Sequence, residues 1–128
     1  MSITASVNGN LQLTDNLSGD TSFLKQLLLS YTGTVSSFAQ SFLLGTSSTT
    51  INIPSTAAQF VYIRNVPTTF TSTVTVTWTP NGGTSSTIAT LAPGASIILS
   101  ETDTTYGITA LSLAASVVNT PIEYILLS

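Results

Sequence analysis

Glu101 and Asp103 form the closest pair of carboxylates in the chain. Paired carboxylates can serve as the acid and base of a glycosidase, and their oxygens are ligands that Ca²⁺ prefers. The surrounding residues, 96–107, contain no basic side chain that would tune or orient such a pair. We therefore expect a solvated loop between two strands here, with calcium binding as the alternative and glycosidase chemistry as the least favoured.

A second group of oxygen ligands, Asp15, Asn16 and Asp20, precedes a segment whose apolar residues recur at helical spacing. In that setting Asp20 is better explained as the N-cap of a helix than as a metal ligand. Lys25 lies in the same segment and is the one side chain that could activate a Ser or Thr hydroxyl as a nucleophile. It falls opposite the apolar stripe, so we expect a solvated charge.

Arg64 is the single arginine, and it lies in the apolar segment Phe60–Asn65. A lone guanidinium among apolar neighbours is typical of an ion-pair or hydrogen-bond anchor. Glu123 is its expected partner, in the same chain or in the next, with another acid as the alternative. The aromatic residues are expected in the core. An exposed aromatic platform for sugars is an alternative without support from their spacing.

Composition removes most other chemistry. The 128 residues contain no Cys and no His, which excludes disulfides, thiolate chemistry and the commonest general base and metal ligand. Two basic residues are too few for a phosphate backbone, so nucleic acid is not an expected partner. Charged residues make up 5% of the chain, whereas 43 residues are Ser or Thr. We expect no enzymatic activity, no cofactor or metal, and no membrane segment, because the apolar runs are short.

Short alternating segments and frequent turn signals predict an antiparallel, all-β protein. In Ser72–Thr79, valine and tryptophan alternate with threonine, which is typical of a half-buried strand. Asn81-Gly82 predicts a hairpin turn, and Pro93-Gly94 fits the centre of a type II turn. With eight to ten such strands, we expect a single β-sandwich domain over residues 1–128, of jelly-roll type.

The N-terminal segment, 1–33, is expected to differ from the main strands of 34–128. Residues 1–17 suggest two short strands around Asn8-Gly9. One short helix is predicted near residues 21–31, with Asp20 able to cap it and Gly33 able to end it. The apolar residues that carry this helical spacing are Phe23, Leu24, Leu27, Leu28 and Tyr31.

Four stretches carry a family resemblance. They are Gln59–Asn65, which ends in Arg-Asn, the Thr-rich strand and Gly-rich hairpin of Thr75–Gly83, the turn and apolar strand of Leu91–Leu99, and Ile122–Leu127. In this order they resemble the small β-sandwich virion proteins of tailed bacteriophages, of the capsid decoration and tail-associated types. The resemblance covers about residues 55–128 and rests on strands and turns, so it transfers no catalytic residue.

The resemblance implies a non-enzymatic structural protein that is made in the host cytoplasm and incorporated into the virion. The first expectation is a protein on the capsid surface that decorates or cements the shell by bridging neighbouring subunits. A tail or neck component and a receptor- or carbohydrate-binding module are the alternatives. Expected partners are the major capsid protein or other virion proteins, and copies of the chain itself, as a trimer by the resemblance. The low charge separately favours a homo-oligomer, because little charge keeps a free monomer soluble.

Overall fold

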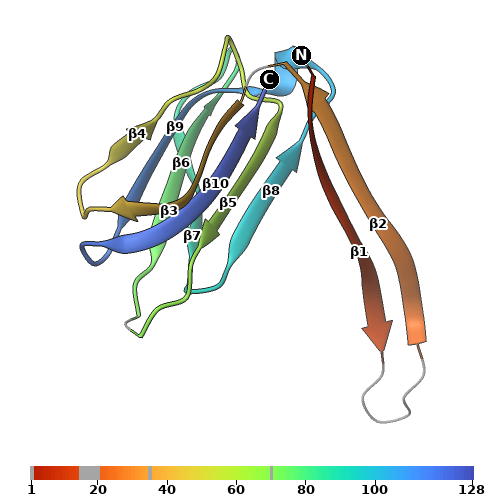
Figure 1. Ribbon diagram of the computed structural model, residues 1–128, viewed down its shortest axis with the longest axis horizontal. Coiled ribbons are helices and arrows are strands. Elements are labelled where there is room, and N and C mark those ends of the chain that lie inside the picture. Colours follow the sequence, from red (N-terminus) through yellow and green to blue (C-terminus); the bar gives the residue numbers. More distant parts are fainter. Residues whose placement is uncertain (1, 15–20, 35, 70) are drawn as a thin grey trace.

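The computed structural model describes residues 2–14, 21–34, 36–69 and 71–128, without the side chains of residues 10–14, 21–25 and 27–29. This described chain is antiparallel β-structure apart from one 3-10 turn, η1 (Thr104–Tyr106). Its strands form two four-stranded sheets and a two-stranded hairpin that stands away from them (Figure 1).

Two facing sheets form a sandwich. Its strands are β3 (Ser36–Leu44), β4 (Thr49–Ile51), β5 (Phe60–Asn65), β6 (Val74–Pro80), β7 (Ser86–Leu91), β8 (Ser96–Ser100), β9 (Ile108–Ala115) and β10 (Thr120–Leu127). Sheet 1 has the order β3-β10-β5-β8, and sheet 2 has the order β4-β9-β6-β7. The chain changes sheet at every link between these strands except the β6–β7 hairpin, which is jelly-roll topology. The predicted antiparallel β-sandwich is confirmed.

The core lies between the two sheets, because alternate residues of each strand point inward. In β6 the predicted alternation holds: Val74 and Val76 are fully buried, and Trp78 packs against the same cluster. Phe42 of β3 meets Tyr124 of β10 inside the sandwich, edge to face, with ring centroids 6.2 Å apart. Burial of these apolar side chains supplies the main force that holds the two sheets together.

Both predicted turns are present. The chain reverses between β6 and β7 at Asn81-Gly82, and Gly82 has a φ of 73°. Before β8, the N–H of Ala95 donates to the carbonyl of Ala92 at 2.9 Å, and Gly94 has a φ of 85°. A positive φ at the third turn position is the requirement of a type II turn, and glycine meets it without steric cost.

The first two strands form a long hairpin, referred to below as the arm. β1 (Ile3–Thr14) and β2 (Thr21–Gly33) pair in antiparallel register from Ile3↔Gly33 to Thr14↔Thr21. The arm starts beside the C-terminus and diverges from the sandwich toward its far end, red and orange in Figure 1. Two hydrogen bonds anchor its base: the N–H of Thr34 donates to the carbonyl of Ser128 at 2.9 Å, and the Tyr31 hydroxyl donates to Gln59 Oε1 at 2.7 Å.

The helix predicted near residues 21–31 is wrong, because this segment is strand β2. Positions 23, 27 and 31 are four residues apart, and an even spacing fits the alternation of a strand as well as the turn of a helix. β1 gives each residue of 23–31 a cross-strand partner, whereas a helix of about ten residues is marginal by itself. Gly33 does not cap a helix; a side chain there would collide with the carbonyl of Ser128 at the base of the arm.

The two short strands expected around Asn8-Gly9 are also wrong. Both residues lie inside the continuous strand β1, where they pair with Leu28 and Leu27. An Asn-Gly pair forms a hairpin turn only when the segments on either side of it pair with each other. Here the partner of β1 comes later in the chain, so the turn lies elsewhere.

Replacing Leu113, which is fully buried, with alanine is expected to lower the free energy of unfolding by about 2–5 kcal/mol, because it leaves a cavity in the core. The matched change Leu43→Ala, at a leucine 59% exposed on β3, should alter it by no more than about 0.5 kcal/mol. Urea titration followed by Trp78 fluorescence measures both. Equal losses for the two variants would contradict the described core.

Candidate functional site

The outer face of sheet 1, turned away from sheet 2, gathers the side chains with the greatest potential for binding. Cross-strand register arranges them in rows. One row, referred to below as the apolar row, crosses all four strands: Phe38 of β3, Ile125 of β10, Tyr62 of β5 and Ile98 of β8. Phe38 is 69% exposed, Ile125 38% and Ile98 36%. Large apolar side chains thus form a continuous, half-open strip across the sheet.

A charged row lies next to the apolar row. Arg64 of β5 and Glu123 of β10 are direct cross-strand partners, and Arg64 Nη1 lies 3.4 Å from Glu123 Oε1. The structure therefore brings together the two residues that the sequence singled out, within one chain. Their side chains are 40% and 28% exposed, and an ion pair so open to water contributes less than about 1 kcal/mol to stability. The pair fixes the position of two charges more than it stabilises the fold.

Tyr62 belongs to the same cluster, and the sequence reasoning assigned it to the core. Its hydroxyl donates to Glu123 Oε1 at 2.7 Å, the shortest contact of the cluster. The signal that could have revealed it is its position two residues before Arg64 on one strand, which places both side chains on the same face. Tyr62 is the link between the apolar row and the charged row.

The pKa of Tyr62 is raised above its ordinary value of 10.0, first by partial burial and then by the hydrogen bond to the Glu123 carboxylate and its negative charge. The folded chain therefore holds the phenol proton more tightly than the unfolded chain. The resulting stabilisation is fully present below pH 10 and is lost as pH rises through the folded pKa. At neutral pH the phenol of Tyr62 is therefore neutral.

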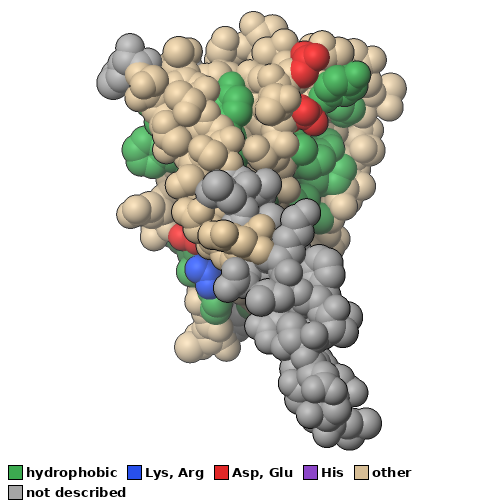
Figure 2. All heavy atoms as spheres, turned by 90° about the vertical axis from the view of Figure 1, so that its right-hand side faces the viewer, with side chains coloured by type: hydrophobic (Ala, Val, Ile, Leu, Met, Phe, Trp, Pro, Cys, Tyr) green, Lys and Arg blue, Asp and Glu red, His purple; other side chains and the backbone are tan. Residues whose placement is uncertain are grey.

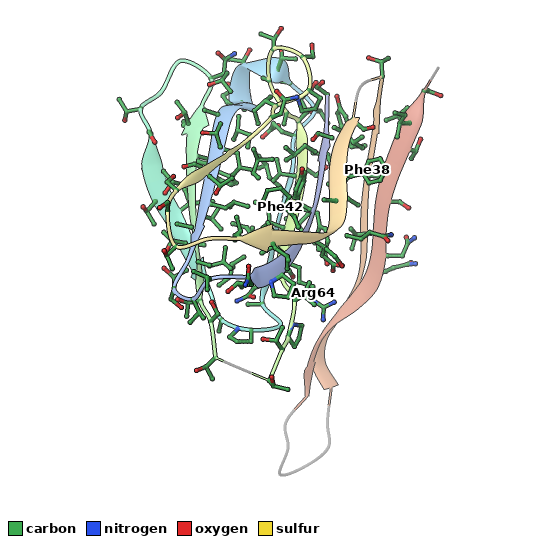
Figure 3. The ribbon with its side chains drawn as sticks, turned by 60° about the vertical axis from the view of Figure 1, so that its left-hand side comes forward. Phe38, Phe42 and Arg64 are labelled. Atoms are coloured by element: carbon green, nitrogen blue, oxygen red, sulfur yellow. The ribbon has the colours of Figure 1, made fainter. Side chains whose placement is uncertain are left out.

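A groove of about 350 Å³ separates this face from the base of the arm. Ile3 and Ala5 of β1 line one wall, and Phe38, Tyr62 and Ile125 line the other. Figure 3 shows Phe38 and Arg64 on the side of the sheet where the arm lies, whereas Phe42 points between the sheets. With an apolar floor and few polar groups, the groove suits an apolar segment of polypeptide better than a charged small molecule.

The carboxylates at 101 and 103 do not converge on a shared ligand. Glu101 accepts a hydrogen bond from the N–H of Thr102 at 3.1 Å, and Asp103 accepts one from the N–H of Thr105 at 2.8 Å. The second bond caps η1 and lowers the pKa of Asp103 from its usual 3.8. Among the described residues no three His, Cys, Asp or Glu side chains come close enough to hold a metal ion. Asp15, Asn16 and Asp20 lie outside the described residues, as does the side chain of Lys25.

A cluster of hydroxyl groups is buried at the end of the sandwich near Thr120. Thr120 Oγ1 lies 2.6 Å from Ser72 Oγ and 2.7 Å from the carbonyl of Val117. Nearby, the buried Asn65 amide donates to the carbonyls of Ser72 and Leu91. These groups contact other hydroxyls and backbone carbonyls rather than a base, so they tie the loops to the sheets and do not activate a nucleophile.

In the part of the chain that the structure describes, no helix is long and apolar enough to cross a membrane.

Comparison with protein families, with curated proteins and with solved structures gives no match for this chain. The surface seen in Figure 2 is mostly tan, the colour of hydroxyl, amide and backbone atoms, with few charged groups. The apolar row and its groove are therefore the features from which a function is inferred.

Replacing Glu123 with glutamine is expected to lower the pKa of Tyr62 toward 10, because the variant removes the negative charge that opposes ionisation of the phenol. NMR titration of ¹³C-labelled tyrosine measures the shift, and the Tyr62→Phe variant assigns the resonance. Glu101→Gln is the matched control and should leave the pKa of Tyr62 unchanged. An equal effect of both variants would show that the hydrogen bond to Glu123 does not act on Tyr62.

Proposed function

We propose that the chain is a non-enzymatic structural protein that assembles with copies of itself on a larger particle, the virion of a tailed bacteriophage. The observation that carries the proposal is the arm together with the apolar row. A two-stranded hairpin is marginal in water by itself, and an exposed strip of large apolar side chains marks an interaction surface. Both features are explained by contacts that form only in an assembly.

Two further observations support the choice of particle. The stretches from Gln59 to Leu127 resemble small β-sandwich virion proteins of tailed phages. The jelly-roll topology is used by viral capsid domains, although lectin domains and cupins use it as well. Fold alone does not determine function, so the virion assignment depends on the resemblance and the assembly features together.

Within the virion, we place the protein on the capsid surface, in contact with the major capsid protein and bridging neighbouring subunits. Contacts made only on the assembled shell stabilise that shell by mass action. The outer face of sheet 2 suits such contacts. Thr77 of β6 and Thr87 of β7 share a hydroxyl–hydroxyl contact of 3.2 Å there, next to Ser112 of β9. Neutral hydrogen bonds of this kind are less sensitive to salt than ion pairs.

Carbohydrate binding is the second candidate function, and one observation favours it. Phe38 offers a widely exposed ring beside a groove that also contains Gln40, Tyr62 and Glu123. An aromatic face next to a carboxylate and an amide is able to stack on a sugar ring and bind its hydroxyls. Binding on a glycan array that is lost in Phe38→Ala and kept in Leu43→Ala would favour this function over a structural one.

The copy number per particle tests the virion proposal. Quantitative mass spectrometry of purified virions should find the chain in hundreds of copies if it decorates the capsid, because a shell repeats its sites by symmetry. A few to a few dozen copies would assign it to the tail or neck instead. Absence from purified particles would refute the virion assignment.

The recombinant chain is expected to sediment as a closed homo-oligomer, with the trimer as the first expectation. Analytical ultracentrifugation over a concentration series measures this state. Because the proposed contacts are mostly uncharged, raising the salt concentration from 0.1 M to 1 M should leave the oligomer intact. A monomer at all concentrations would contradict self-assembly.

A further inference from the structure

We propose that copies of the chain join by exchanging arms, so that the arm of one copy lies along the apolar row on the outer face of sheet 1 of the next. This inference rests on the self-assembly proposed above and names the surface that produces it.

The first argument is that the arm receives little support from its own chain. At its base, Ile3, Ala5 and Val7 are half-buried and line grooves shared with the sandwich, while the intervening Thr4 and Ser6 are exposed. Farther along, the described side chains of Asn8 and Gln26 are exposed, and Figure 1 shows the arm moving away from the sandwich. The described side chains of this part of the arm therefore lack a packing surface in their own copy.

The sequence of the far part contains two consecutive apolar residues, Phe23 and Leu24, in strand β2. Consecutive residues of a strand belong to opposite faces, so these two cannot be confined to one face. One sandwich can cover only one face of the arm. The other face requires a surface from outside the copy.

In each copy, the outer face of sheet 1 already packs against the base of that copy's own arm. Phe60 and Leu127 lie on the outer face of sheet 1, yet they are only 2% and 1% exposed, because the base of the arm passes over them. The apolar row is the next row of the same face, and there Phe38, Ile125 and Ile98 remain open. A second arm, from another copy, would cover these open side chains as the first arm covers Phe60 and Leu127.

Size and charge agree with a second copy as the occupant. Twelve paired rows give a ribbon roughly 40 Å long and about 10 Å wide, so each face offers on the order of 400 Å². When two copies exchange arms reciprocally, both contacts lie in one interface and each copy buries about 800 Å² there, the share of each partner in a standard interface; in a ring of three or more, each interface holds one arm and buries about 400 Å² per partner.

Charge complementarity points the same way. Arg64, 40% exposed, adjoins the apolar row and is the single cationic side chain of residues 34–128. The sequence that joins β1 to β2 contains Asp15 and Asp20. The arm therefore carries acids in its sequence, whereas the receiving face carries a cation. A closed ring of copies satisfies every arm and every apolar row without another partner.

The absence of cysteine from the chain allows a direct test. Two differently tagged single-cysteine variants, Gln26→Cys in the arm and Gln40→Cys, at an exposed position of β3 in the groove beside Phe38, are co-expressed, and the purified assembly is oxidised. The expected result is a disulfide-linked heterodimer, which reports only contacts between copies. Pairing Gln26→Cys with Thr90→Cys, an exposed position on β7 of sheet 2, is the control and should give no heterodimer.

Two further variants measure the energy of the contact. Replacing residues 10–26 with Asn-Gly keeps the base of the arm and should convert the oligomer to a monomer with an unchanged strand signal in circular dichroism. Phe38→Glu should raise the dissociation constant of the oligomer by about 30-fold or more, whereas Leu43→Glu on the same strand should leave it within about threefold.

The outcomes separate the two proposals. If the full chain assembles but the variant with the short arm assembles equally well, and no heterodimer forms, arm exchange is overturned and self-assembly stands. If the full chain is monomeric at every concentration, both are overturned. A heterodimer between positions 26 and 40 together with a monomeric short-arm variant supports arm exchange.

Discussion

Leu126 and Leu127 are consecutive residues of β10, and both are fully buried; Phe60 and Val61 of β5 behave in the same way. Neighbouring residues of a strand point to opposite faces, so the centre of sheet 1 is covered on both faces. Sheet 2 covers the inner face, and the base of the arm covers part of the outer face. The need to cover both faces of sheet 1 explains why the arm starts where it does, beside the C-terminal end of β10.

The outer face of sheet 2 does not need an apolar cover. Its outer face carries hydroxyl side chains, as in the contact between Thr77 and Thr87, and these can face water without a cover. Threonine fits a strand through its branched β-carbon and offers a hydroxyl that either donates or accepts. The two outer faces thus have different roles. One tolerates solvent, whereas the other is apolar and only half covered.

The parts of the structure that were predicted correctly depend on residues that are neighbours in the chain. The alternation of β6, the turn at Gly94 and the sandwich as a whole follow from local spacing and local backbone preference. The arm was missed because its helical spacing is also even, and only the pairing with β1 decides between the two readings. Tyr62 and the apolar row were missed for a related reason. They arise from the register of four strands that are distant in sequence, and their aromatic members Phe38 and Tyr62 were expected in the core, whereas Phe38 is 69% exposed.

The pairing of Arg64 with Glu123 shows that a few charges can help to determine the register of two strands. A shift of one residue between β5 and β10 would turn every side chain of one strand to the other face, and would place an unpaired charge in the core. The pair therefore opposes wrong registers even though it adds little to stability in water. In the proposed assembly its second consequence is orientation. Apolar contacts along the row provide attraction without direction, and one fixed cation at the side of the row makes the two ends of an incoming arm unequal. The combination of an undirected apolar strip with a single, well-placed charge suits a protein that must dock many identical copies in one orientation.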